Sequence, residues 1–219
     1  MKPLVIFGTG GFAEMAHYYF ESDSDYSVAA FTVDAPYVAG DTFKGLPVIA
    51  FEELEARFPP DQVTMYVAMG IQKVNQQRAS KVAEAEARGY RLASYLSSKA
   101  KVADDLILHP NTFIMEEVIM QPMVSVGRDS VLWPRCVVGF RSSIGDHCWL
   151  TAVMVGESVT IGDYTFIGLN ATIPSYRQIA PSNVIGAGAL ILEDTKEYSI
   201  YKGHGSEVSR VPSYRLHKI

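Results

Sequence analysis

Residues 155–168 read VGESVTIGDYTFIG, and this short stretch shows the rule that organises half of the chain. An aliphatic residue returns at every sixth position, and a glycine follows it each time. The same six-residue spacing holds from Val102 to Leu150 and, after one five-residue step, from Val155 to Ile191. Hexapeptide repeats of this kind form parallel β-helices. The aliphatic positions are Val102, Leu108, Ile114, Met120, Val126, Leu132, Val138, Ile144, Leu150, Val155, Ile161, Ile167, Ile173, Ile179, Ile185 and Ile191.

The repeat predicts triangular coils, in which each hexad supplies one short strand and one corner. Three hexads make a coil, so the array predicts about five stacked coils that bury their apolar faces only against one another. Glycine after the aliphatic residue suits a tight turn or an unusual backbone torsion. The residue four places after the aliphatic one is often small, but Arg177 and Asn183 break this rule. We therefore expect a bulged corner or a projecting loop near residues 174–184.

The N-terminal half follows a different pattern, with a glycine loop between a strand and a helix. The loop, Gly8-Thr9-Gly10-Gly11-Phe12-Ala13, follows an apolar strand at Leu4–Phe7 and precedes a helix. It matches the G-x-G-x-x-G/A fingerprint, in which a helix N-terminus receives phosphate. A second strand ends at Asp34, where the fingerprint places an acid for ribose. The predicted nucleotide-binding residues are Gly8, Gly10, Gly11 and Asp34; the alternative is a tight turn that binds no ligand.

Strands and helices continue to alternate up to residue 97, which predicts a small Rossmann-like α/β domain with a parallel sheet. Its last strand is expected at Arg91–Leu96. The domain is too short for the second half that a dinucleotide normally needs, so a nucleotide diphosphate fits better than NAD. Gly70 at a strand end and Arg78 on the next helix are further binding candidates, or else a plain turn and a solvated charge. We predict two domains, residues 1–97 and an all-β domain at 98–219 that includes a C-terminal tail.

Composition narrows the classes of function. The net charge is −5 and no long basic run occurs, which argues against nucleic acid as a partner. No apolar stretch has the length of a membrane span, and glycine interrupts the first apolar segment too early for a signal peptide. Cys136 and Cys148 occupy equivalent repeat positions on different sides of the predicted prism, so we expect neither a disulfide nor a metal site. These features predict a cytoplasmic protein.

The motifs together resemble a known family. A glycine-loop α/β domain, a hexapeptide array and the segment 185–191, IGAGALI, resemble bacterial sugar acyltransferases of the sialic acid O-acetyltransferase type. That family includes acetyltransferases of nucleotide-linked amino-dideoxy sugars. The similarity is closest at Trp133 and in segments 144–148, 161–173 and 193–201. It implies a left-handed β-helix and a homotrimer with sites between subunits; parallel crossovers are otherwise right-handed, so the handedness comes from the resemblance alone.

The resemblance also implies a reaction and its substrates. Acetyl-CoA would be the co-substrate, and the acceptor would be the amine of a UDP- or dTDP-linked sugar used for surface glycans such as lipopolysaccharide O-antigen. A base would take the amine proton during attack on the thioester, and a backbone N–H would stabilise the oxyanion. The residues implied in acyl-CoA binding are Gly168, Gly186, Ala187, Gly188, Tyr201 and Lys202.

The position of the catalytic base departs from the family. Relatives carry a histidine at the third residue of the hexad that starts here at Val155, and this chain has Glu157 there. Glu157 would serve as the base if an apolar wall raised its pKa. His147, in the same part of the array, is the second catalytic candidate. The third explanation needs no protein base, because a neutral amine attacks a thioester readily once it is positioned.

Other functions remain open from sequence alone. The missing histidine suggests a catalytically silent homologue that binds nucleotide sugar or acts as a scaffold. A sugar O-acetyltransferase is a further alternative, although a hydroxyl acceptor needs deprotonation more than an amine does. The glycine loop by itself would also suit a nicotinamide-dependent enzyme, which the short α/β domain disfavours.

Overall fold

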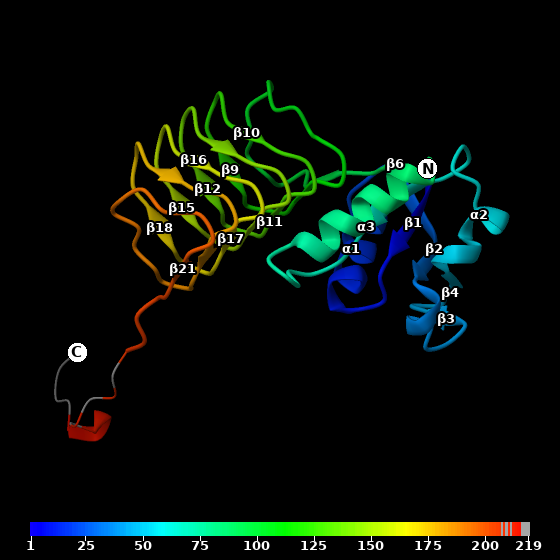
Figure 1. The fold of residues 1–219 in the computed structure, drawn as a ribbon, viewed down its shortest axis with the longest axis horizontal. Helices are drawn as coiled ribbons and strands as arrows, with labels where there is room; N and C mark the ends of the chain where they lie inside the picture. Colours follow the sequence, from blue (N-terminus) through cyan, green and yellow to red (C-terminus); the bar gives the residue numbers. More distant parts are fainter. Residues whose placement is uncertain (207, 209, 211, 216–219) are drawn as a thin grey trace.

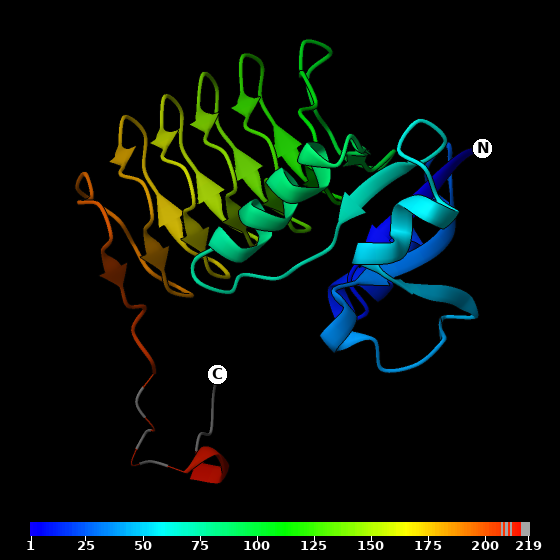
Figure 2. The same cartoon turned by 45° about the vertical axis from the view of Figure 1, so that its right-hand side comes forward.

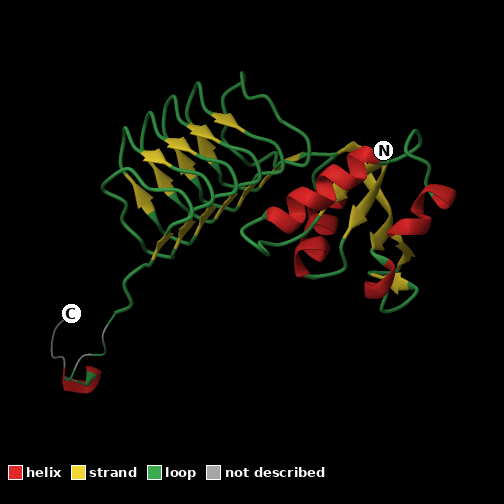
Figure 3. Cartoon of the chain, viewed as in Figure 1, coloured by secondary structure: helices red, strands yellow, loops and turns green. Residues whose placement is uncertain are grey.

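The computed structural model describes residues 1–206, 208, 210 and 212–215, which form an α/β unit beside a β-helix (Figure 1). The remaining residues of the predicted tail (207, 209, 211 and 216–219) lie outside the described part. The chain leaves the last coil after β21 (Ile200–Tyr201) and runs away from both units to a short 3-10 turn, η3 (Ser213–Arg215) (Figures 1 and 3).

The first unit is Rossmann-like, as the glycine loop predicts. Its sheet has the strand order β3-β4-β2-β1-β5-β6, and all pairs are parallel except the β3–β4 hairpin. Residues Leu4–Phe7 of the central strand are buried, since a parallel sheet is covered on both faces. The elements are β1 (Lys2–Phe7), α1 (Gly11–Ser22), β2 (Tyr26–Val33), η1 (Ala35–Tyr37), β3 (Thr42–Phe43), β4 (Leu46–Ala50), η2 (Phe51–Glu53), α2 (Leu54–Arg57), β5 (Thr64–Val67), α3 (Gln76–Ala87) and β6 (Arg91–Leu92).

The second unit is a left-handed parallel β-helix. Two-residue strands stack into three sheets, and the second residue of each strand points inward, so that Leu132, Leu150 and Ile167 form one buried ladder. The strands are β7 (Tyr95–Leu96), β8 (Phe113–Ile114), β9 (Ile119–Met120), β10 (Ser125–Val126), β11 (Val131–Leu132), β12 (Val137–Val138), β13 (Ser143–Ile144), β14 (Trp149–Leu150), β15 (Met154–Val155), β16 (Thr160–Ile161), β17 (Phe166–Ile167), β18 (Thr172–Ile173), β19 (Gln178–Ile179), β20 (Val184–Ile185) and β21.

The three sheets differ in what they present outward. The docked sheet (β7, β8, β11, β14, β17, β20, β21) carries aromatic residues that the α/β unit covers. The open sheet (β9, β12, β15, β18) presents apolar side chains such as Ile119 and Met154, which are 38% and 51% exposed. The polar sheet (β10, β13, β16, β19) presents Ser125, Ser143 and Thr160. The prism therefore has one covered apolar face, one uncovered apolar face and one polar face. Figure 2 shows the stacked coils that form it.

The segment Arg91–Leu96 is not one strand, so the sequence prediction for it was wrong. β6 pairs with β5 in the first sheet, whereas β7 pairs with β8 and opens the β-helix. Leu96 lies one hexad before Val102 and packs against the coil interior, so the repeat begins earlier than its sequence signal. The exact domain boundary near residue 97 stays a prediction.

The glycines of the repeat are required for a different reason from the expected one. A Cβ on Gly139 would lie 2.5 Å from the carbonyl carbon of Gly156 in the next coil, and one on Gly168 would lie 2.7 Å from the Ala187 nitrogen. Glycine is thus required by the close stacking of coils. The positive φ falls elsewhere in the corners, on residues such as Asp129 (φ 52°).

The predicted bulge near residues 174–184 is absent, and that prediction was wrong. β19 pairs with β16 and β20 with β17 in unbroken register. Asn183 fits the buried small-residue position because its amide donates to the carbonyl of Ala180. The five-residue step is absorbed in one corner, so Val137 still pairs with Met154.

The two units are joined by aromatic packing on the docked sheet. Phe12 on α1 contacts Phe113 and Trp149 edge-on, with ring centroids 5.8 and 4.9 Å apart. Where the chain crosses between units, the Asp23 carboxylate accepts hydrogen bonds from the Tyr95 hydroxyl (2.7 Å) and the Ser98 N–H (2.9 Å). Burial acts to raise the pKa of Asp23, but these hydrogen bonds outweigh it and lower the pKa to about 2.

Candidate functional site

A cavity of about 680 Å³ opens at the carboxyl ends of β1, β2 and β5. β1 lies between β2 and β5, so the chain changes direction across the sheet at this point. Ligands of open α/β sheets bind in the crevice at such a switch point. Four of the predicted nucleotide-binding residues line the cavity: Gly8, Gly10, Asp34 and Gly70.

The glycine loop combines a close backbone contact at Gly8 with open space at Gly10 and Gly11. Gly8 has a φ of +124°, and a Cβ there would lie 2.8 Å from the Ala68 carbonyl oxygen, so no other residue fits easily. Gly10 caps α1, and a Cβ on Gly10 or Gly11 would meet nothing within 4 Å. No side chain caps the first backbone N–H groups of α1, and the space beside Gly10 and Gly11 is open, which leaves room for a phosphate.

Lys81 on α3 is a cavity residue that the sequence analysis missed. Its Nζ donates to Asp34 Oδ1 at 2.6 Å and to Glu84 Oε2 at 2.5 Å, and it lies 4.9 Å from the centre of the Phe7 ring. Burial acts to lower the pKa of Lys81, but the hydrogen bonds and charges of Asp34 and Glu84 outweigh it and raise the pKa. Lys81 thus remains protonated and holds the Asp34 carboxylate at the cavity wall. No sequence motif signals this lysine, because the contact depends on how α3 packs.

Arg78 does not line the nucleotide cavity, and the structure places it elsewhere. Its side chain is fully buried between α3 and the β-helix, where Nε donates to Asp129 Oδ1 at 2.9 Å. Nη2 donates to the carbonyl oxygens of Asp129 (2.9 Å) and His147 (3.3 Å). The guanidinium is therefore committed to holding the two units together.

Asp129 is the centre of this buried junction. Besides Arg78, its carboxylate accepts hydrogen bonds from Asn111 Nδ2 at 2.7 Å and from His147 Nδ1 at 2.8 Å. Asn111 also bonds both backbone groups of Val67, at the end of the strand that forms the cavity floor. A continuous polar network thus connects the nucleotide cavity to one corner of the β-helix.

His147 faces a different cavity from the one that holds Asp34. It lines a cavity of about 660 Å³ between α3 and the β-helix, and its ring stacks on Tyr164 with centroids 4.8 Å apart. The bond from Nδ1 to Asp129 leaves Nε2 as the nitrogen able to accept a proton. His147 thus has the chemistry of a base, in a cavity on the opposite side of α3 from the nucleotide cavity.

Glu157 lies at another corner of the prism, between the open and polar sheets. Its side chain is exposed, and Oε1 accepts a hydrogen bond from the Tyr176 hydroxyl at 2.6 Å. The backbone N–H of Glu157 donates to Ser175 Oγ. Within one chain the structure does not bring Glu157 and His147 together, and the described contacts of Glu157 are polar rather than an apolar wall.

The residues predicted to bind acyl-CoA divide into two groups. Gly188, Tyr201 and Lys202 line a cavity of about 600 Å³ at the last coils. Gly168 and Gly186 lie between stacked coils, where a Cβ would meet the next coil within 3 Å. Ala187 is exposed beside them. The structure thus gathers half of this set around one cavity.

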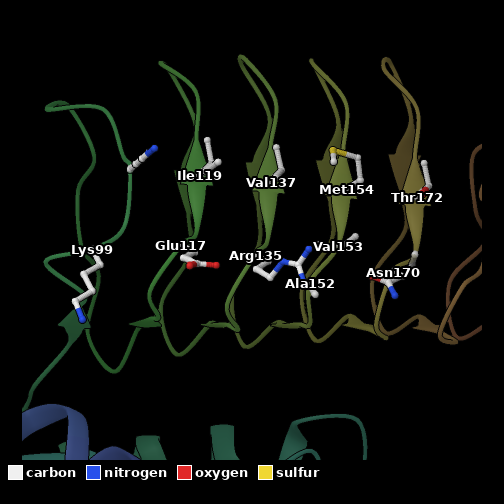
Figure 4. Close-up of a pocket in the computed structure, with 12 residues that line it drawn as sticks. Lys99, Glu117, Ile119, Arg135, Val137, Ala152, Val153, Met154, Asn170 and Thr172 are labelled. Atoms are coloured by element: carbon white, nitrogen blue, oxygen red, sulfur yellow. The ribbon is translucent and has the colours of Figure 1, made fainter.

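A further cavity, of about 630 Å³, lies along the edge between the docked and open sheets, which we call the groove corner (Figure 4). The sequence-predicted site residues lie outside the set that lines it. Lys99, Glu117, Arg135, Ala152 and Asn170 occupy equivalent places there on successive coils. The five-residue step between Leu150 and Val155 falls at this corner, and it was the one sequence signal for the cavity.

The described residues contain neither a helix able to cross a membrane nor a cluster of three metal-ligating side chains.

Comparison with known proteins supports the architecture. Residues 3–82 match the sequence model of the PglD N-terminal domain family. A comparison with curated proteins finds no match. The fold and its cavities define a Rossmann-like domain joined to a left-handed β-helix, the architecture of the solved structures described next.

Three solved structures share this fold over almost the whole chain. A variant of perosamine N-acetyltransferase from Caulobacter crescentus, in complex with CoA and GDP-perosamine, is 21% identical, with a TM-score of 0.81 and coverage of 93% of this chain and 94% of that one. The acetyltransferase domain of PglB from Neisseria gonorrhoeae is 20% identical, with a TM-score of 0.71 and coverage of 93% and 97%. WeeI from Acinetobacter baumannii is 18% identical, with a TM-score of 0.57 and coverage of 97% and 94%. At these identities the likeness establishes the fold.

Proposed function

We propose that this protein transfers an acetyl group from acetyl-CoA to the amine of a nucleotide-linked amino-dideoxy sugar, for bacterial surface glycans such as O-antigen. The observation that carries the proposal is the pair of cavities at the predicted places in one chain. One is the glycine-loop cavity with Asp34, and the other is the cavity at Gly188, Tyr201 and Lys202. Solved relatives with this fold bind CoA and GDP-perosamine.

The nucleotide diphosphate would sit at the N-terminus of α1, with its ribose hydroxyls on Asp34. Gly10 and Gly11 leave the N–H groups of the helix open, and the helix dipole favours an anion there. Lys81 is the one basic side chain among the described residues that line this cavity. The nucleotide itself is best tested directly, with UDP-, dTDP- and GDP-linked 4-amino-4,6-dideoxy sugars.

The chemical step would proceed by direct attack of the neutral amine on the thioester carbonyl carbon. The C–S bond breaks, CoA leaves as the thiolate, and the proton lost from nitrogen ends on the thiolate or in water. His147 and Glu157 lie at separate corners, which supports positioning rather than a dedicated base as the main contribution. This mechanism predicts that Glu157→Gln and His147→Gln each lower kcat less than tenfold.

A homotrimer would cover the open sheet. Ile119, Met154 and Leu190 are exposed apolar side chains along it, and Val137 is half-buried there; exposed apolar patches of this kind mark contact surfaces. Light scattering on the purified chain tests this assembly, and Met154→Glu should shift it towards the monomer. A monomer at all concentrations would refute the trimer. We also propose a cytoplasmic location, where acetyl-CoA is available.

The decisive experiment is a thiol-release assay with acetyl-CoA and the amino-sugar nucleotides. Thiol release that depends on the acceptor, with an acetylated sugar amine seen by mass spectrometry, is the expected result. Saturable binding of both substrates without turnover would favour the silent homologue instead. Thermal stabilisation by NAD but not by CoA would point to a nicotinamide enzyme, and acetylation of a sugar hydroxyl to an O-acetyltransferase.

A further inference from the structure

The cavity at the groove corner is not used by the proposed function, although its side chains form an ordered column. Lys99, Glu117, Arg135, Ala152 and Asn170 stand on successive coils (Figure 4). Adjacent strands in a sheet are about 4.8 Å apart, which sets the spacing of this column. The side chains of the column are therefore evenly spaced along the edge of the prism.

The charges in this cavity are unbalanced. Lys99, Lys101 and Arg135 line it together with a single acid, Glu117. Among the described residues, none of these four takes part in an ion pair. Three cations and one anion leave a net charge of +2 facing one concave site, in a chain whose net charge is −5. Such a site attracts an anion.

The middle of the column is hollowed where the coil is one residue short. Ala152 stands between Arg135 and Asn170 and carries only a methyl group, with a φ of 41° at the shortened corner. Val137 and the half-exposed Met154 form an apolar wall beside it. The recess thus has an apolar middle and a basic end.

The same edge leads to the cavity proposed for CoA. Asn170 and Gly188 continue the column, and Gly188 lines the cavity that contains Tyr201 and Lys202. Ala152 and Gly188 are separated by two coil steps, or roughly 10 Å. The extended pantetheine arm of a CoA seated at Tyr201 is long enough to cover this distance, so its sulfur can reach the recess at Ala152.

We propose that the basic end of this groove receives a carboxylate carried by one of the two substrates, either on the acyl group or on the sugar. The inference rests on the acyl transfer of the proposed function, because it takes the thioester to lie at Ala152; a carboxylate on the acyl group would replace acetyl by a dicarboxylic acyl group, whereas one on the sugar leaves acetyl as the group transferred. Arg135 offers a planar fork that matches a carboxylate, and Lys101 and Lys99 add charge. A methyl or hydroxymethyl group in the same place leaves the cations without a partner.

The donor arm of the test measures the binding of CoA, acetyl-CoA, butyryl-CoA and succinyl-CoA to the full chain by calorimetry. Succinyl-CoA and butyryl-CoA differ by a terminal carboxylate in place of a methyl group. If the acyl group carries the carboxylate, succinyl-CoA binds about tenfold more tightly, equal to about 1.4 kcal/mol. Arg135→Gln should reduce this preference to below twofold, while Arg135→Lys keeps part of it and Arg57→Gln, on exposed α2, keeps all of it.

The acceptor arm compares UDP-glucuronate with UDP-glucose and GDP-mannuronate with GDP-mannose, in the presence of CoA. A tenfold preference for the acidic sugar that Arg135→Gln abolishes assigns the carboxylate to the sugar. Equal binding within every donor and acceptor pair refutes the inference while leaving acetyl transfer intact. If neither CoA nor acetyl-CoA binds, the proposed function fails, and the inference fails with it. A change in oligomeric state on Arg135→Gln, without a change in any preference, also refutes the inference.

Discussion

Replacement of Arg78 by methionine tests whether the buried junction holds the two units together. Arg78 and Asp129 are both fully buried, so the change leaves an uncompensated carboxylate in the interface. Breaking such a pair costs about 3–5 kcal/mol. Asn111 and His147 still donate to Asp129 in the variant, so we expect a loss near the lower limit, about 3 kcal/mol. For a chain of this size that loss lowers Tm by about 6–12 °C.

Tryptophan fluorescence during urea unfolding is a suitable assay, because the Arg78 guanidinium lies 5.3 Å from the Trp149 ring. The matched control is Lys44→Met, whose pair with Glu14 is 42% and 54% exposed and whose loss should therefore destabilise the protein much less. The double variant Arg78→Met, Asp129→Leu should recover part of the loss. If Arg78→Met costs no more than Lys44→Met, the network around Asp129 does not stabilise the interface, and our reasoning is wrong.

Three further predictions concern the fold. The pKa of Asp23 in the folded protein, about 2, lies below its value in the unfolded chain. The stability that ionised Asp23 contributes is therefore full above about pH 4 and is lost as the pH falls through 2. The difference in urea stability between wild type and Asp23→Asn should shrink over that window. Burial raises the pKa of Cys136 to about 11 and that of Cys148 to about 12, so iodoacetamide at pH 8 should label neither in the native protein, and mass spectrometry showing rapid labelling would contradict their burial. Gly139→Ala should destabilise by about 1–3 kcal/mol, because its methyl group meets the next coil; a calorimetric Tm equal to that of wild type would argue against the stacking distance.

The β-helix could be predicted because its determinants are local and repeated. Each of the sixteen aliphatic positions had only to face inward, and the period alone placed residues such as Ile144 and Ile161 in the core. The same logic failed at Asn183, where polarity suggested a bulge, but the side chain stays buried while its Nδ2 donates hydrogen bonds to the carbonyl oxygens of Ala180 and Pro181. The six-residue period predicts which side chains point inward, but it does not predict how the structure accommodates an unusual residue at such a position.

The candidate site was predictable only where a backbone motif defines it. Gly8, Gly10 and Asp34 follow from the strand–loop–helix order, and the structure places all three at one cavity. Lys81 and Arg78 depend on the packing of α3, which a single sequence does not encode in any short pattern. Lys81 and Arg78 lie on neighbouring turns of that helix, but Lys81 points towards the cavity and Arg78 towards the β-helix. Their spacing in the sequence does not predict this difference.

The last strand of the docked sheet breaks the rhythm of the repeat. β21 pairs Tyr201 with Ile185, 16 residues earlier rather than the 18 that separate Ile185 from Ile167. A stack of parallel coils ends in unpaired backbone groups that can template a further strand from another molecule. β21 supplies that strand from the same chain, and Gly203 closes over Ala187 behind it. β21 is itself the edge of this sheet, but it lies out of the repeat spacing, and the chain then leaves the stack. An irregular edge disfavours the end-to-end growth that a perfect repeat would invite.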